Sequence, residues 1–117
     1  MKKVLIVEDN AAMSAALKVY LVSKGLEAPT AGDGIEALEI LEKSVPDLII
    51  LDVIMPRMDG YGFLLEIKKN AKFRSIPVVV VSAREMMRDL FVQEGVKDFI
   101  AKPYDQEALF KIITKYL

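Results

Sequence analysis

Short apolar runs constrain the fold of this chain more than any other feature of its sequence. Four of them lie at residues 4–7, 48–51, 78–81 and 98–101, and they are rich in valine and isoleucine. Runs this short are typical of strands, and the lack of alternation with polar residues indicates burial on both faces of a sheet. The segment from Leu26 to Thr30 is a weaker candidate for a fifth strand.

Between these runs, apolar residues recur at the spacing of amphipathic helices. The five expected helices cover residues 13–21, 35–41, about 60–70, about 85–93 and 109–117. Asp33 followed by Glu36 is typical of a capping box at the start of the second helix, and Gly95 is placed to end the fourth. The predicted order is therefore a strand followed by a helix, repeated five times.

Alternating strands and helices are expected to form an open parallel sheet, because right-handed crossovers place helices on both of its faces. The predicted fold class is α/β, with a doubly wound, five-stranded (βα)5 sheet. A chain of 117 residues that is 53% hydrophobic can bury a core as one unit. No linker or repeat interrupts it, so we expect one domain over residues 1–117.

The charged and reactive residues exclude several classes of function. The 16 basic and 17 acidic residues are not gathered into blocks of one sign. This argues against direct binding to nucleic acid and against binding to a membrane surface. The chain has no cysteine and no histidine, so its chemistry must use oxygen atoms and lysine. The first apolar run ends at Glu8, too early for a signal peptide, and none approaches the ~20 residues of a membrane span. We expect a cytoplasmic location.

Charged and hydroxyl side chains stand where the predicted strands end. Glu8 and Asp9 follow the first run, Asp52 follows the run at 48–51, and Ser82 and Lys102 follow the last two. The carboxyl ends of parallel strands meet at one edge of the sheet, where such folds bind ligands. Asp52 is the most informative of these residues, because it ends a central buried strand and has no basic neighbour in the sequence.

Together these residues resemble the receiver domain of two-component response regulators, and the resemblance spans the whole chain. Each motif is weak alone, but their combination in this order at strand ends is specific. The resemblance implies a flavodoxin-like strand order 2-1-3-4-5 and a stand-alone, single-domain receiver, although an excised domain would look the same. The motifs that carry it are Glu8-Asp9, Leu51-Asp52-Val53-Ile54-Met55-Pro56, Asp59-Gly60, Ser82-Ala83 and Lys102-Pro103.

The acidic residues also imply a metal ion. Carboxylates that lie close together repel one another and have raised pKa values unless a cation neutralises them. An all-oxygen set of ligands suits Mg²⁺ better than zinc. By resemblance, Asp9 and Asp52 supply carboxylate oxygens, Glu8 acts directly or through water, and the backbone carbonyl of Ile54 completes the protein ligands.

The resemblance further implies a phosphorylation switch. Asp52 is then the phosphoacceptor, Lys102 offsets the charge of the transferring group, and Ser82 hydrogen-bonds the phosphoryl group once it has arrived. Ser82 and Phe99 form the switch, in which the aromatic ring turns inward to fill the space that the hydroxyl leaves. The bond between Lys102 and Pro103 is expected to be cis, as X-Pro bonds can be.

The same resemblance implies the partners. A sensor histidine kinase or a phosphotransfer protein supplies the phosphoryl group, and a downstream protein target reads the changed surface. The chain is then a signalling module that assists its own phosphorylation and dephosphorylation, not an enzyme that turns over a metabolite. A monomer and a phosphorylation-dependent dimer are both consistent with the sequence.

Simpler interpretations exist for single residues. Residues 8–10 could cap the first helix, and Ser82 with Glu85 matches a capping box for the fourth. Lys102 could be a solvated lysine at a strand end, and Phe99 could be an ordinary core residue. The simpler account requires all of these coincidences at once.

Three features depart from the pattern of the family. Phe99 stands where tyrosine is frequent, and Ser82 stands where threonine is commoner. The interval from Ser82 to Gly95 is shorter than is usual in the family, which predicts that the loop before the fourth helix, or that helix itself, is trimmed. That helix also carries more apolar residues, over 86–92, than one buried stripe requires.

Three other functions are possible for a chain with this pattern of strands and acids. A phosphohydrolase of the haloacid dehalogenase type needs an acid two places after its nucleophile, where this chain has Ile54. A flavin or nucleotide binder needs a hydroxyl- and glycine-rich loop after the first strand, where the acids in residues 8–10 would repel phosphate. A receiver-like interaction module that does not depend on phosphorylation stays open, although Asp52, Ser82 and Lys102 all favour the switch.

Overall fold

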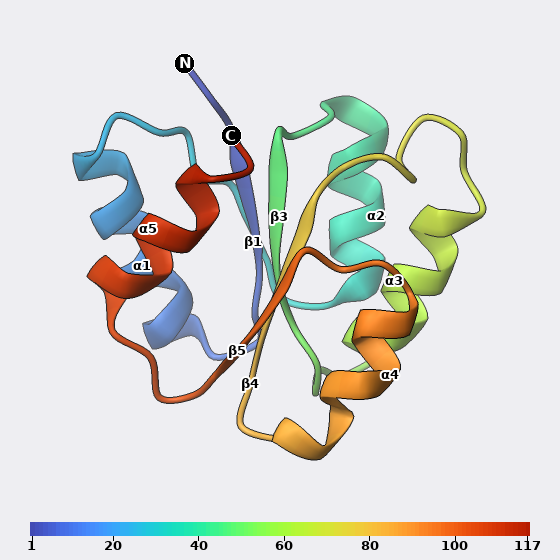
Figure 1. The fold of residues 1–117 in the computed structure, drawn as a ribbon. Helices are drawn as coiled ribbons and strands as arrows, with labels where there is room; N and C mark the ends of the chain where they lie inside the picture. The colour runs from blue at the N-terminus through green and yellow to red at the C-terminus, as the bar shows by residue number, and fades with distance from the viewer.

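The computed structural model describes residues 1–117 as one parallel sheet with helices on both faces (Figure 1). The sheet has five strands in the order β2-β1-β3-β4-β5, and every neighbouring pair is parallel. This confirms the predicted α/β class and the strand order 2-1-3-4-5. The strands are β1 (Val4–Val7), β2 (Thr30–Ala31), β3 (Leu48–Asp52), β4 (Val78–Ser82) and β5 (Asp98–Ala101).

The helices alternate with the strands along the chain. Figure 1 shows α1 and α5 on one face of the sheet and α2, α3 and α4 on the other. None of the helices has the length and apolar character that crossing a membrane requires. The helices are α1 (Ala11–Ser23), α2 (Gly34–Lys43), α3 (Gly60–Lys68), the short 3-10 helix η1 (Glu85–Met87), α4 (Arg88–Gln93) and α5 (Gln106–Thr114).

Two hydrophobic clusters, one on each face, hold these layers together. In β1, Leu5 and Val7 pack into the cluster under α2, α3 and α4, whereas Val4 and Ile6 pack into the cluster under α1 and α5. Neighbouring residues of a strand point to opposite faces, so a strand that is covered on both sides must be apolar throughout. This explains why the strand segments read as continuous apolar runs.

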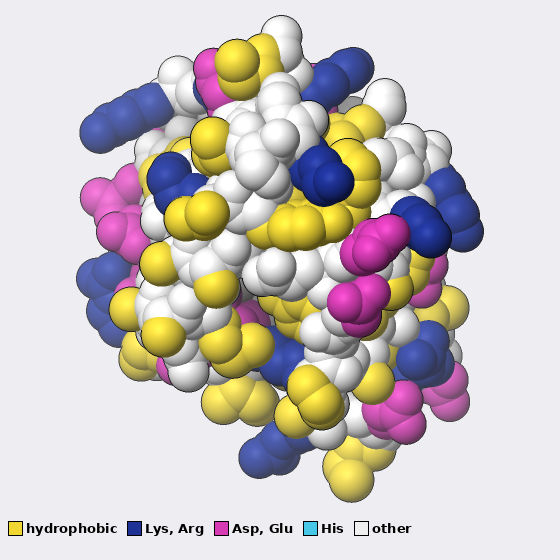
Figure 2. All heavy atoms as spheres, turned by 90° about the vertical axis from the view of Figure 1, so that its left-hand side faces the viewer, with side chains coloured by type: hydrophobic (Ala, Val, Ile, Leu, Met, Phe, Trp, Pro, Cys, Tyr) yellow, Lys and Arg dark blue, Asp and Glu magenta, His cyan; other side chains and the backbone are white.

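The outer surface of the α1 and α5 layer is mixed in character. Figure 2 shows basic and acidic side chains interspersed on this face, with apolar groups gathered near its middle. Val19 and Val22 of α1 contribute exposed apolar surface. Because neither sign of charge forms a continuous field, this face has no electrostatic footprint for a polyanion.

Side chains cap four of the helices. Asn10, Asp33, Asp59 and Asp105 each accept a hydrogen bond from the backbone N–H three residues later. Such caps satisfy N–H groups that have no partner within the helix. The capping box predicted at Asp33 is present in a shifted form, because the carboxylate of Glu36 accepts from the N–H of Gly32.

Two predicted elements differ in the structure. The second strand is limited to Thr30–Ala31, because Glu27 forms only an isolated bridge with Lys3 and Pro29 has no N–H to donate. The fourth helix is interrupted, since its first turn is the 3-10 helix η1. The capping box suggested for Ser82 and Glu85 is absent, because the Ser82 hydroxyl instead accepts from the N–H of Arg84 at 3.0 Å.

Candidate functional site

The strand ends bring the predicted site residues to one edge of the sheet. Asp52 is the last residue of β3, and Glu8 directly follows β1, which pairs with β3 in register at Val7 and Leu51. Ser82 ends β4 and pairs with Ala101, the last residue of β5. Lys102 directly follows Ala101. The parallel topology therefore places the two acids at the ends of the neighbouring strands β1 and β3, and the lysine at the same edge of the sheet after β5.

Three carboxylates form the centre of this edge. Oxygen atoms of Glu8, Asp9 and Asp52 all lie within 4.8 Å of one another. Glu8 and Asp52 are buried, with 7% and 6% of their surface exposed, whereas Asp9 is exposed. The N–H of Asn10 donates to Glu8 Oε2 at 3.1 Å, which fixes one buried carboxylate against the start of α1.

Lys102 lies between the two buried carboxylates. Its Nζ donates to Glu8 Oε1 at 2.6 Å and to Asp52 Oδ1 at 3.2 Å, and only 16% of its side chain is exposed. The backbone N–H of Lys102 donates to the carbonyl of Ser82, and the peptide bond to Pro103 is cis. Lys102 is therefore a partner of the acidic cluster and not a solvated lysine.

The charges of the cluster are unevenly compensated. Burial, together with the negative charge of Glu8, raises the pKa of Asp52 to about 6, although Lys102 opposes this shift. Burial would also raise the pKa of Glu8, but hydrogen bonds from Lys102 and Asn10 outweigh it and lower that pKa. Burial would lower the pKa of Lys102, but the hydrogen bond to Glu8 and the negative charges of Asp52 and Glu8 outweigh it and raise that pKa. One ammonium group thus serves two buried carboxylates.

The donor atoms of this site fit a hard divalent cation. Three carboxylates face one lysine, which leaves an excess of negative charge that a divalent ion would neutralise. The backbone carbonyl of Ile54 accepts no hydrogen bond in the protein and is free to bind a ligand. All of these donors are oxygen atoms, as Mg²⁺ prefers, so the acidic triad fits a magnesium site.

Ser82 and Phe99 make no hydrogen bond to the three carboxylates. Ser82 is buried, and its hydroxyl oxygen accepts a hydrogen bond from the N–H of Arg84. The ring of Phe99 is 2% exposed and packs against Phe91 of α4, with a centroid separation of 6.1 Å. The guanidinium carbon of Arg88 lies 5.0 Å from the centre of the same ring. Phe99 thus connects β5 to α4 within the core.

Sequence reasoning missed one pair of residues beside the site. Arg57, in the segment between β3 and α3, donates from Nε to Asp33 Oδ2 at 2.7 Å and from its second terminal nitrogen to Oδ1 at 3.1 Å. The sequence pattern predicts Asp33 only as a helix cap. The two residues are 24 positions apart, and no local pattern in the sequence predicts their contact.

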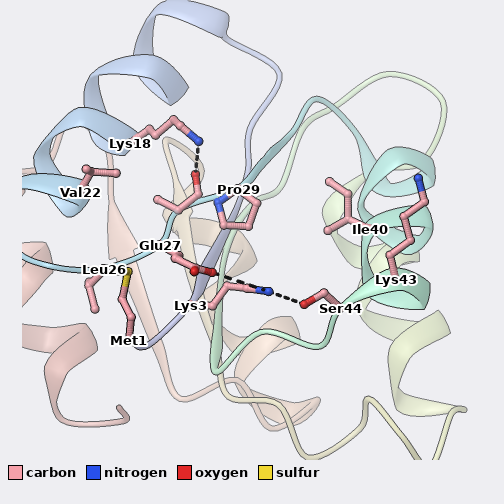
Figure 3. Close-up of a pocket in the computed structure, with 11 residues that line it drawn as sticks. Met1, Lys3, Lys18, Val22, Leu26, Glu27, Pro29, Ile40, Lys43 and Ser44 are labelled. Carbon is pink, nitrogen blue, oxygen red and sulfur yellow. Dashed lines mark hydrogen bonds and ion pairs between the residues drawn. The ribbon is translucent and has the colours of Figure 1, made fainter.

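The largest cavity of the structure is not part of this site. It has a volume of about 510 Å³ and lies beside β2, between α1 and α2 (Figure 3). Lys18 on its wall donates to the carbonyl of Ala28, and Lys3 contacts Ser44 and Glu27. None of the predicted site residues lines it.

Solved structures share this fold over nearly the whole chain. The signal receiver domain of a signal transduction histidine kinase from Syntrophus aciditrophicus is 34% identical, with a TM-score of 0.91, and the match covers 100% of this chain and 90% of that one. The response regulator TrrA of Thermotoga maritima, in complex with Mg²⁺ and BeF, is 29% identical, with a TM-score of 0.89 and full coverage of both chains.

Sequence comparison leads to the same family. Response regulator Rre1 of Synechocystis is 34% identical over 116 residues, which are 97% of this chain and 50% of that protein. The chain spans about half the length of this relative. The family model of the response regulator receiver domain matches residues 4–114. The chain therefore belongs to the response regulator receiver domain family.

Proposed function

We propose that this domain is a phosphorylation-dependent signalling switch in which Asp52 accepts the phosphoryl group. The observation that carries the proposal is the buried carboxylate of Asp52, which ends the central strand β3 between two other carboxylates and one lysine. Membership of the receiver family supports the same function. The unit that we propose to carry it comprises residues 1–117.

A bound Mg²⁺ ion would neutralise the acidic edge and allow a phosphate to approach. Glu8, Asp9, Asp52 and the carbonyl of Ile54 would hold it. The related regulator TrrA has been solved in complex with Mg²⁺ and BeF, which supports this assignment. The chain's own contribution is to hold these oxygen atoms together before the phosphodonor arrives.

Asp52 then acts as the nucleophile. One of its carboxylate oxygens forms a bond to phosphorus while the bond between phosphorus and the donor's imidazole nitrogen breaks, and the electron pair of that bond leaves with the nitrogen. Lys102 already lies 3.2 Å from Asp52 and would stabilise the charge on the phosphoryl oxygens. Ser82 would donate its hydroxyl hydrogen to one of them.

The same hydroxyl links the site to the proposed output surface. Ser82 now accepts from the N–H of Arg84, so turning toward a phosphoryl group would alter the segment that leads into η1. Phe99 already lies in the core beneath Arg88 and against Phe91. We propose that Ser82 and Phe99 form the switch, and that it acts by changing how η1 and α4 pack over this ring.

The partners follow from this chemistry. A sensor histidine kinase or a phosphotransfer protein would supply the phosphoryl group in the cytoplasm, and a downstream protein would bind the altered surface. The domain would act as a monomer or as a phosphorylation-dependent dimer, and it would turn over no metabolite. An interaction module that is independent of phosphorylation is less favoured, because Asp52, Ser82 and Lys102 are all present at the strand ends.

Intact mass measurement after incubation with Mg²⁺ and acetyl phosphate tests the proposal. We expect a single phosphoryl adduct on the wild-type protein and none on Asp52→Ala. An adduct on the variant would remove Asp52 from its role. A wild-type protein that binds Mg²⁺ but gains no adduct would instead favour the phosphorylation-independent module.

A further inference from the structure

The segment that follows Asp52 contains a tight turn centred on Arg57. The N–H of Met58 donates to the carbonyl of Pro56 at 2.7 Å, and the φ angle of Arg57 is 60°. A hydrogen bond between residues two apart, around a residue of positive φ, has the form of the rare classic γ-turn. Arg57 is the only residue other than glycine with a positive φ in this chain. The backbone at Arg57 therefore needs support from its surroundings.

The side chain of Arg57 provides one such support. Its guanidinium group binds both carboxylate oxygens of Asp33, at 2.7 and 3.1 Å. A planar guanidinium matches a carboxylate in this two-bonded geometry, which a lysine cannot reproduce. Hydrogen bonds from Arg57 and from the N–H of Glu36 hold the pKa of Asp33 below its ordinary value.

Asp33 is itself held firmly at the start of α2. Its Oδ1 accepts from the N–H of Glu36 at 2.9 Å, as an N-cap does. The adjacent Gly34 donates its N–H to the carbonyl of Met58 at 3.0 Å. A Cβ atom on Gly34 would lie 2.7 Å from Met58 Cγ, so the two segments are packed closely. The turn is therefore tied to α2 by both backbone and side chain.

The other end of the same segment is tied to β3. The N–H of Gly60 donates to the carbonyl of Val53 at 2.8 Å, and a Cβ atom on Gly60 would lie 2.2 Å from the carbonyl oxygen of Asp52. Ile54 lies between these two anchors, with its side chain 53% exposed and its carbonyl without a hydrogen bond. The Ile54 carbonyl thus belongs to a segment that is anchored to β3 at Gly60 and to α2 beside Arg57.

We propose that the ion pair of Arg57 with Asp33 is a positioning clamp that holds residues 53–59 against α2, directs the carbonyl of Ile54 toward the acidic triad and thereby sets its affinity for Mg²⁺. The inference rests on the proposed function, because it uses the metal assigned there. Arg57 is a positioning residue, since it acts through the backbone and touches none of the three carboxylates.

Electrostatics alone predicts the opposite result, which makes the clamp testable. Arg57 carries a positive charge near an acidic site, so removing that charge would strengthen the binding of a cation if only Coulomb forces mattered. Loss of the clamp would instead weaken the binding of the cation, because the Ile54 carbonyl would no longer be held in place. Partners that orient metal ligands commonly contribute tenfold or more to metal affinity.

The experiment compares Mg²⁺ affinities by isothermal titration calorimetry at one ionic strength. We expect Arg57→Ala to bind Mg²⁺ about tenfold more weakly than the wild type. Arg57→Lys keeps the charge without the two-bonded contact and should lose a smaller part of the affinity. Arg74→Ala is the matched control, because Arg74 is exposed and forms no ion pair, and its affinity should stay at the wild-type value.

Hydrogen exchange of the metal-free proteins provides a second measurement. The N–H groups of Gly34 and Met58 form the two hydrogen bonds that hold the turn, so both should exchange faster in Arg57→Ala and in Arg57→Lys than in Arg74→Ala. If Arg57→Ala does not fold, Arg57→Lys carries the same comparison with the fold and the charge retained.

Three outcomes would overturn the clamp. The first is faster amide exchange in Arg57→Ala together with an affinity for Mg²⁺ that is unchanged or higher. The ion pair would then be a structural contact that has no effect on metal binding. Unchanged exchange at both amides would show that the turn does not need the ion pair. A wild-type protein that does not bind Mg²⁺ would overturn both the clamp and the proposed metal site. A wild-type protein that binds Mg²⁺ but gains no phosphoryl adduct would overturn only the proposed function.

Discussion

At the scale of single residues, the buried negative charge of Asp52 lowers the stability of the folded protein. Lys102 is shared with Glu8 at 2.6 Å, so Asp52 receives only the longer contact of 3.2 Å. Burial and the charge of Glu8 therefore raise the pKa of Asp52 from 3.8 to about 6. The folded protein therefore gains stability when a cation binds beside Asp52 or when the negative charge of Asp52 is removed.

This imbalance predicts a pH-dependent gain in stability for Asp52→Asn without metal. Because the pKa of Asp52 is higher in the folded state, the folded protein binds more protons than the unfolded chain between about pH 4 and pH 6. The contribution of Asp52 to stability must then fall as pH rises through that window. At pH 7 we expect the variant to unfold with a free energy about 2 kcal/mol higher than that of the wild type.

Urea denaturation in the presence of a chelator measures this difference. The advantage of Asp52→Asn over the wild type should shrink toward zero as the pH is lowered from 7 to 4, because Asp52 then becomes protonated. A difference that is the same at both pH values would mean that Asp52 is not under electrostatic strain.

At the scale of secondary-structure elements, α4 depends on aromatic packing more than on its own length. The helix has six residues and no side-chain cap, and isolated helices of that length are not stable. Phe91 anchors it, since its ring is fully buried and contacts both Phe99 and Tyr61, at centroid distances of 6.1 and 5.5 Å. This ring also lies on the proposed route from Ser82 to the surface.

Phe91→Ala is therefore expected to lower the free energy of unfolding by about 3–5 kcal/mol, because it leaves a cavity under α4. Val92→Ala in the same helix is the control, since Val92 is 52% exposed and should change stability by about 0.5 kcal/mol or less. Denaturant unfolding of both variants measures the difference. Equal effects would show that α4 does not depend on Phe91.

The region around α4 also shows which features of the fold local sequence patterns can predict and which they cannot. The strands, and the helices at 11–23 and 34–43, were predictable because their apolar spacing and caps are local. The 3-10 turn of η1 was not, because Ser82 and Glu85 satisfy the capping-box pattern while the hydroxyl in fact bonds to Arg84. The limits of β2 also depend on which strand residues pair with β1, which is a tertiary contact.

At the scale of the whole molecule, the acidic edge joins parts of the chain that are far apart. Glu8 and Lys102 are separated by 94 positions, and Asp52 lies between them in the sequence. Anything that binds this edge in the folded state, and not in the unfolded chain, must stabilise the entire domain. Magnesium binding and global stability are therefore linked.

We expect Mg²⁺ at a hundredfold excess over its dissociation constant to stabilise the wild-type protein by about 2.7 kcal/mol. Asp9→Asn should lose most of this gain, but its stability without metal should match that of the wild type, because Asp9 is exposed and makes no hydrogen bond or ion pair. Thermal unfolding with Mg²⁺ and with a chelator tests both statements. Full stabilisation of Asp9→Asn by Mg²⁺ would exclude Asp9 as a ligand.

The sequence by itself determined the layered α/β fold and the identity of the residues at the strand ends. Apolar runs specify buried strands, and a parallel sheet necessarily brings the carboxyl ends of its strands to one edge. Only the tertiary structure decided how the charges there are shared, with Lys102 bonded to Glu8 and Asp52 at once. It also decided that Arg57 contacts Asp33, because pairs distant in sequence meet only when the elements that carry them have packed.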